Sequence, residues 1–447
     1  MKIKLILSAI IGLCGYFCSY GQTALTLSDA IRVGLANNFS IQIEKQRQQV
    51  AANNNTWGQA GLFPNITLNA TQGFSNTNID NPAGFLSDGS IKASNFNPVV
   101  TANWTIFNGF NVRMTKERLQ LLEDQSDGNA AIIIENTIQA IILAYYQVLL
   151  EQERTEVFRS SLVLSKDRYQ YSKLKGEFGS AVTFDILKDK NSYLTDSSNF
   201  VTQQLNYINS VRNLNLLLGN DVQTGLRIVD SLTVVEKEFN LDELMAQMTS
   251  TNSNLKNQYI NQEIFRRDIA IAKSATYPTI SLNLSGSNNW QTQDLSDAQF
   301  ANGSVGSSGI KSTTGNMSAN LTLAFTLFNG GIIQNQIKNA RISEQIGQLQ
   351  IRDLELTLKN SLIANYDSYN LRKRLLNIAS ENVNTSELNL QLGEDRYKNG
   401  SINSFDYRDL QITYLQTALS YYQSIYNLIE TEVELMRLTG NILNSYQ

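Results

Sequence analysis

Apolar and polar residues alternate in four short segments of the chain. In residues 66–70 every second side chain is apolar, and residues 280–284 repeat the pattern. Two later segments show it again, with apolar residues at Val100, Ala102, Trp104 and Ile106 and at Leu321, Leu323, Phe325 and Leu327. A period of two predicts β-strands with one apolar and one polar face. We therefore expect two β-hairpins built from strands of about 10 residues.

The segments inside the two hairpins are polar and rich in small residues. Residues 75–97 and 286–315 contain many Asn, Ser, Gly and Asp, which are the residues of turns and loops. We predict long loops there, and the hairpins then span about 64–107 and 278–328.

Two long segments lack the residues that interrupt helices. Glycine is rare in residues 111–174 and 332–399, and no proline occurs in either. Apolar residues between Ile132 and Leu149 recur at spacings of three and four, as helix packing requires. The pattern predicts two helices of about 65 residues, roughly 100 Å each. Helices of that length need neighbours along their whole course, as in a coiled-coil bundle.

Two further helices are expected before the hairpins. Thr26 and Asn240 each place a side-chain oxygen where a helix N-cap is needed, with an acidic residue three positions later. We expect a continuous helix of roughly 35 residues from each, running toward Phe63 and Tyr277.

The same plan occurs twice in the chain. Leu62–Pro64 recurs as Thr276–Pro278 at an offset of 214, and Phe107–Gly109 recurs as Phe328–Gly330 at an offset of 221. Length therefore varies only inside the hairpin, where loops tolerate insertion. We predict an internal duplication with a first repeat, a connector, a second repeat and a tail, at residues 22–220, 221–239, 240–441 and 442–447.

Residues 1–21 have the pattern of a secretory signal peptide. Two lysines precede the apolar run Leu5–Cys14, and the small residues Ser19 and Gly21 precede the expected cleavage before Gln22. No small residue precedes either cysteine, so a lipid anchor is not expected. No later run of about 18 apolar residues is evident, so we expect no transmembrane helix.

The composition disfavours an enzyme. The chain has 0 His, and its 2 Cys both lie in the signal segment. The commonest nucleophile–base pairs and zinc sites are therefore missing, and we expect no metal or cofactor. A carboxylate hydrolase stays a minor alternative without a recognisable acid–base pair. The net charge is -4 with mixed signs, so nucleic acid is not an expected partner.

Four strands in an exported chain favour the wall of a transmembrane β-barrel in a lipid bilayer. Any one strand alone would fit a half-buried sheet of a soluble domain better. Because four strands cannot close a barrel around a pore, several chains must share one barrel. Three chains would supply twelve strands.

The segment Arg396–Asp409 resembles the turn between the long helices in TolC-like outer-membrane efflux proteins. The two Phe-Asn-Gly motifs resemble the strand-to-helix junction of that family, and the duplicated plan extends the resemblance over nearly all of residues 22–447. The resemblance implies a mixed α and β membrane channel, with a trimeric 12-stranded outer-membrane barrel and a coiled-coil periplasmic tunnel.

The resemblance also implies partners and a function. It implies a homotrimer that docks to a periplasmic adaptor protein and an energised inner-membrane transporter, and that serves as a passive exit duct for small molecules. A duct for secreted polypeptides and a non-conducting coiled-coil surface scaffold stay open as alternatives.

Three acidic residues are candidates for the periplasmic aperture. Asp406 and Asp409 lie three residues apart near the start of a helix, and the resemblance places them at the tunnel constriction, with Asp185 as a weaker candidate. The alternative is that they only stabilise a helix N-terminus. The first repeat has Lys188 in place of Asp409, so the two tips are not interchangeable.

Other candidates lie at the tips and near the strands. Gly179 and Gly400 are expected to end the long helices, and with Ser180 and Ser401 they are candidates for adaptor docking. By the resemblance, Arg396 and Tyr397 are candidates for a closed-state latch between neighbouring coiled coils, and a solvated charge and a half-buried aromatic are the alternatives. Trp104 and Tyr277 are candidates for an aromatic belt at a membrane interface, with core packing as the alternative.

Overall fold

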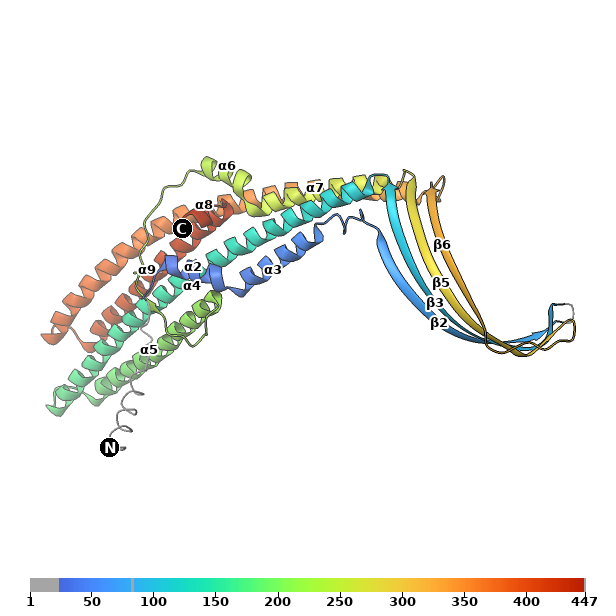
Figure 1. Ribbon diagram of the computed structural model, residues 1–447. Helices are drawn as coiled ribbons and strands as arrows, with labels where there is room; N and C mark the ends of the chain where they lie inside the picture. Colours follow the sequence, from blue (N-terminus) through green and yellow to red (C-terminus); the bar gives the residue numbers. More distant parts are fainter. Residues whose placement is uncertain (1–23, 82–83, 446–447) are drawn as a thin grey trace, which may run out of the picture. The chain divides into compact units, whose positions relative to one another are not determined.

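The computed structural model describes residues 24–81 and 84–445 (Figure 1). The predicted signal peptide, residues 1–21, lies outside the described residues. The described chain divides into two compact units. One contains residues up to Gln46, Gly128–Lys256 and residues from Asp353 onward, and the other contains Arg47–Asp127 and Asn257–Arg352. The first unit is helical, and the second holds the sheet and the adjoining ends of helices.

The sheet is antiparallel, with the order β2-β3-β5-β6. Its strands are β2 (Asn65–Asp80), β3 (Leu86–Asn108), β5 (Thr279–Phe300) and β6 (Ile310–Ala324). The two predicted hairpins are thereby confirmed, and β3 and β5 join them. β2 and β6 are the two edges of this sheet within the chain.

The strands are longer than predicted, and most of the two predicted loops is strand. β3 has 23 residues and begins at Leu86, β2 runs to Asp80, and β5 has 22 residues and ends at Phe300. The polar strand ends pair without an apolar face, and cross-strand contacts such as the 3.1 Å ion pair of Lys92 and Asp297 stabilise them. β6 ends early, at Ala324, because its partner β5 begins at Thr279 opposite that residue. Phe325 therefore lies beyond the strand.

Four helices dominate the first unit. They are α4 (Asn111–Glu177), α5 (Thr183–Leu218), α8 (Ile332–Lys398) and α9 (Ser404–Leu438). α4 and α8 have 67 residues each, so the two predicted long helices are confirmed. They form two antiparallel pairs, α4 with α5 and α8 with α9 (Figure 1).

One expectation about membrane-spanning helices needs correction. Among the described residues, α4 contains an 18-residue window apolar enough to cross a membrane by length and composition. Half of that window is buried inside the protein. Ile138, Ile142 and Val148 of α4 are each at most 1% exposed, so this part of the helix packs in the core of the bundle.

The two helices predicted before the hairpins are each broken in two, so that prediction is wrong. The pieces are α2 (Leu27–Asn37) and α3 (Phe39–Asn54), and α6 (Leu241–Thr251) and α7 (Ser253–Ser274). The breaks fall at Asn38 and Asn252, which are equivalent positions of the two repeats.

The asparagine side chain at each break satisfies backbone groups on two elements. The Asn38 amide donates to the Leu217 carbonyl at 2.8 Å, and its oxygen accepts from the Ser40 N–H at 2.9 Å. The Asn252 amide donates to the Leu438 carbonyl at 2.9 Å, and its oxygen accepts from a backbone N–H of α7. Each asparagine thus caps a new helix and binds a free carbonyl at the end of α5 or α9.

The connector between the repeats crosses the helical unit. Its strand β4 (Arg227–Ile228) pairs in parallel with β1 (Ala24–Leu25). The Tyr145 hydroxyl lies 2.6 Å from the Asp230 carboxylate, and the Tyr369 hydroxyl lies 2.9 Å from the Lys237 carbonyl. One tyrosine from each long helix therefore holds the connector. The short helix α10 (Ile442–Ser445) follows α9.

Asn38→Ala should lower the free energy of unfolding by about 1–3 kcal/mol, because a cap and a buried hydrogen bond are both lost. Urea unfolding followed by the helical circular dichroism signal measures this. Asn37→Ala, at an exposed neighbouring position, is the matched control and should change stability by no more than about 0.5 kcal/mol. Equal effects of the two variants would contradict the role given to the Asn38 side chain.

Candidate functional site at the tips of the long helices

Both long helices end in the same left-handed turn. Gly179 and Gly400 each have φ of 72°. The Ser180 N–H donates to the Lys175 carbonyl and the Ser401 N–H to the Arg396 carbonyl, both at 2.8 Å. A side chain at either glycine would meet nothing within 4 Å, so backbone conformation alone calls for glycine there. The predicted helix ends are confirmed, and the docking role of these turns stays a prediction.

The three aperture candidates occupy different surroundings. Asn403 caps α9 by accepting from the N–H groups of Phe405 and Asp406, at 2.8 and 2.9 Å. Asp406 and Asp409 are exposed, and Asp185 in the first turn of α5 is half-buried. Asp185 and Asp409 line one cavity of about 260 Å³, and Asp406 is not among its lining residues.

The cavity is lined by groups of both charges. Lys188 and Arg408 stand beside Asp185 and Asp409 in its wall. The Lys188 ammonium lies 3.2 Å from the ring centre of Phe405, a cation–π contact that holds it against α9. The difference between the two tips at Lys188 therefore places a cation in the wall of the same cavity as Asp409.

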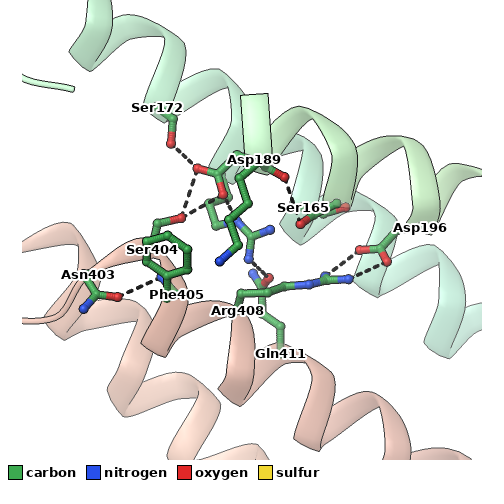
Figure 2. Close-up of polar contacts among 12 residues, drawn as sticks. Ser165, Ser172, Asp189, Asp196, Asn403, Ser404, Phe405, Arg408 and Gln411 are labelled. Atoms are coloured by element: carbon green, nitrogen blue, oxygen red, sulfur yellow. Dashed lines mark hydrogen bonds and ion pairs between the residues drawn. The ribbon is translucent and has the colours of Figure 1, made fainter. Parts of the chain in front are cut away.

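A buried ion pair between α4 and α5 forms part of the cavity wall. The Arg168 Nε atom is 2.9 Å from Asp189 Oδ1, and the two side chains are 0% and 4% exposed. The Asp189 carboxylate also accepts from the Ser172 hydroxyl of α4 and, at 2.8 Å, from the Ser404 hydroxyl of α9 (Figure 2). Burial lowers the pKa of the Arg168 guanidinium, and the adjacent Asp189 carboxylate opposes that shift.

A second ion pair joins α9 to α5 (Figure 2). Arg408 donates to both oxygens of Asp196, at 2.7 and 2.8 Å, and the Asp196 side chain is 2% exposed. One turn further along α9, Gln411 accepts from Arg168 at 2.9 Å. Three residues near the start of α9 therefore bind α4 and α5 through polar contacts. We call the seven residues that make these contacts the tip network: Arg168, Ser172, Asp189, Asp196, Ser404, Arg408 and Gln411.

The two latch candidates point in different directions. Tyr397 is buried, stacks on Tyr407 with ring centres 4.9 Å apart, and meets the edge of Tyr171 at 5.5 Å. Arg396 is exposed. Tyr397 thus joins α8 to α9 and α4 inside one chain, and whether either residue acts as a latch stays a prediction.

Sequence reasoning missed the tip network. Asp189 and Asp196 are seven residues apart and share one face of α5, while the second repeat has Leu410 and Thr417 at the equivalent positions. An acidic residue that replaces a leucine at a packing position is the signal that could have revealed Asp189.

The interface candidates Trp104 and Tyr277 lie in the sheet unit. Trp104 is 41% exposed, and its Nε1 donates to the Leu62 carbonyl at 2.8 Å. Tyr277 is 51% exposed. Eight residues along β3 from Trp104, Phe96 stacks on Trp290 of β5, with ring centres 5.6 Å apart. Aromatic side chains thus mark two levels of the sheet.

Residues 30–220 and 244–441 both match the sequence model of the family described as outer membrane efflux protein. The chain belongs to this family. It is 20% identical over 396 residues to outer membrane protein TolC of Escherichia coli, covering 85% of this chain and 75% of that protein. TolC of Salmonella enteritidis is also 20% identical, over 425 residues that cover 92% of this chain and 81% of the relative.

Solved outer-membrane channels share the fold. The CmeC outer membrane channel of Campylobacter jejuni superposes with a TM-score of 0.74 at 15% identity, over 93% of this chain and 86% of that one. The open state of the MtrE outer membrane channel of Neisseria gonorrhoeae gives 0.71 at 15% identity, over 93% and 89%. The proteins that this chain matches are outer-membrane channels.

Arg408→Ala should destabilise the tip strongly, by about 3–5 kcal/mol, because it leaves the buried Asp196 carboxylate without its cationic partner. Adding Asp196→Ala should recover part of that loss. Urea unfolding measures both, and Arg396→Ala, an exposed arginine at the same tip, is the matched control. If Arg408→Ala and Arg396→Ala behave alike, the ion pair contributes nothing to the folded state.

Proposed function

We propose that this chain is the outer-membrane channel-tunnel of a tripartite efflux system. In this proposal it is a passive exit duct for small molecules that an inner-membrane transporter expels through a periplasmic adaptor. The observation that carries the proposal is the combination, in a member of this family, of an apolar-faced sheet with open edges and two 67-residue helices.

The sheet has the height and surface of a barrel wall. Ile66, Leu68, Leu321 and Leu323 are each about 70% exposed in the single chain, and lipid would cover such a face. The eight residue-to-residue steps along β3 from Trp104 to Phe96 span roughly 27 Å at about 3.4 Å per residue. That length matches an apolar band of about 25 Å flanked by aromatic girdles.

The open edges support a homotrimer. In lipid the unpaired N–H and C=O groups of β2 and β6 would have no water to bind, and each unsatisfied group costs several kcal/mol. β6 of one copy can pair with β2 of the next, and three copies would close a barrel of twelve strands.

The tips of the long helices would form the periplasmic entrance. In a trimer, Asp406 and Asp409 from three chains would form rings of carboxylate, which attract cations. Asp185 would lie behind that ring, in the wall of the cavity it shares with Asp409. The tip network would hold α9 against α4 and α5 in the closed entrance, and Tyr397 would hold α8 against α9 and α4. Arg396 is exposed and lies outside these contacts. The turns at Gly179 and Gly400 would meet the adaptor.

Reconstitution in a planar bilayer tests the function. We expect trimers by light scattering in detergent and discrete single-channel conductance after insertion. A duct for secreted polypeptides would conduct as well. Deleting the gene for this chain and measuring whether export of small molecules or of secreted polypeptides is lost separates the two alternatives. Trimers that insert and never conduct would favour the non-conducting scaffold, and a stable folded monomer would contradict the shared barrel.

The double variant Asp406→Ala, Asp409→Ala should weaken cation selectivity and block by multivalent cations, because a trimer would lose six carboxylates at its entrance. Reversal potential and block by a trivalent cation measure the change. The control is Asp242→Ala, Glu243→Ala, which removes two exposed acidic residues from the first turn of α6. Unchanged selectivity in intact trimers would make the two aspartates ordinary helix-start residues.

A further inference from the structure

The sheet has a polar face opposite its apolar face, and one row of side chains across it consists of asparagines. Asn65 of β2 pairs with Asn103 of β3, and Asn103 pairs in turn with Asn283 of β5. Asn283 pairs with Asn320 of β6. Neighbouring side chains in such a row have Cβ atoms about 5 Å apart, so the four carboxamides form a continuous band across all four strands.

The next row on this face consists of hydroxyl groups. Two residues further along each strand, Thr67 pairs with Thr101, and Thr101 pairs with Ser285. Ser285 pairs with Ser318. The hydroxyls of Thr67 and Thr101 are 2.7 Å apart, so their side chains lie on the same face. Because side chains alternate between the two faces of a strand, the asparagines share this face, and the apolar residues between the two rows lie on the other.

Within the described strands, this polar face carries no charged side chain over most of its length. It consists of the odd positions of 65–77, 93–105 and 279–293 and the even positions of 310–324. A chain that is 17% charged would by composition place several charges on a solvated face of this size. The side chains there are instead Asn, Gln, Ser and Thr, apart from five small or apolar residues: Gly73, Ala93, Val99, Ile310 and Ala324.

The charged residues of the four strands lie toward the hairpin turns. Lys92 pairs with Asp294 near the end of β5, and Lys311 is the second residue of β6. The complete set in the described strands is Asp80, Asp88, Lys92, Asp294, Asp297 and Lys311. The charge-free face therefore extends from the junction with the helices to these strand ends.

A charge-free polar wall acts on solutes differently from a charged one. In the proposed barrel the apolar face meets lipid, so the polar face lines the pore. Carboxamides and hydroxyls both donate and accept hydrogen bonds, so they keep the wall hydrated and can contact any polar solute. They carry no fixed charge, whereas rings of charged side chains select ions by sign.

We propose that the sheet forms a charge-neutral segment of the pore. Cations, anions and neutral polar molecules contact its wall through hydrogen bonds alone, and the wall does not discriminate between them by charge. Any charge selectivity of the channel then comes from residues outside this part of the sheet. The inference rests on the proposed function and deepens it, because it describes a part of the duct that accepts small molecules irrespective of their charge.

The reactivity of introduced cysteines tests the proposal, because the described residues contain no cysteine. Trimers carrying Asn103→Cys in lipid vesicles are treated with a cationic or an anionic methanethiosulfonate reagent in about 0.1 M salt, where charges beyond about 10 Å are screened. A wall potential of one kT would change the ratio of the two reaction rates about sevenfold. We expect a ratio within about threefold of the ratio for mercaptoethanol in solution, and a larger departure would overturn the neutral wall.

The matched control is Ala102→Cys, on the opposite face of the same strand. In the proposed barrel this thiol faces lipid, and it should react with either reagent at least about tenfold more slowly, because the thiolate does not form in apolar surroundings. Asn283→Cys and its control Leu284→Cys repeat the comparison on β5, where Leu284 pairs with Ala102. The second pair decides the test if a variant of the first does not assemble.

The outcomes separate this inference from the proposed function. Fast reaction of the two control cysteines and slow reaction of the two asparagine positions would reverse the faces and overturn the inference. Equal reaction of all four would mean that the sheet is not in lipid, which would overturn the shared barrel as well. Labelling does not require conduction, so a channel that never conducts but shows the expected rates would overturn the proposed function and leave the neutral polar face.

Discussion

The constraint on which the rest of the structure depends is that a β-sheet in lipid cannot have open edges. Four strands leave the backbone groups of β2 and β6 unpaired within the chain, and four strands are too few to surround a pore. In the proposed channel, other copies of the chain would complete the sheet. The strands lead directly into helices of 67 residues, whose stability comes mainly from packing on neighbours, and the proposed assembly would supply neighbours that the single chain lacks.

The elements that follow from local chemistry were predictable from the sequence. The length of α4 follows from the absence of proline and the apolar spacing within it, and the strands follow from their period of two. The helix breaks at Asn38 and Asn252 were not predictable, because each depends on a carbonyl about 180 residues away, at Leu217 or Leu438. The outer halves of the strands were missed because they have no apolar face to signal them.

The candidate site also contains features that the sequence predicts and features that it does not. The helix ends at Gly179 and Gly400 follow from a local backbone requirement, so the sequence identifies them. Buried charges such as Arg168 and Asp189 look like surface charges in a sequence that is 17% charged, and only the packing of α9 on the α4–α5 pair reveals them. A buried ion pair costs more to separate than an exposed one, so in the proposed channel the tip network would resist opening more than exposed charges would.

The two repeats differ in the polarity of equivalent helix faces, and this difference has a physical explanation. Where α4 meets α9 inside one chain, the contact includes the polar pair Arg154 and Gln423, and the chain itself keeps the helices close. At the equivalent positions α8 has Leu375 and α5 has apolar residues around Thr202. A contact between separate copies must overcome the loss of translational and rotational freedom, and burial of apolar surface is the interaction that supplies such free energy most directly. In the proposed assembly, helix faces that join copies would therefore be expected to stay apolar, while a contact inside one chain is free to become polar.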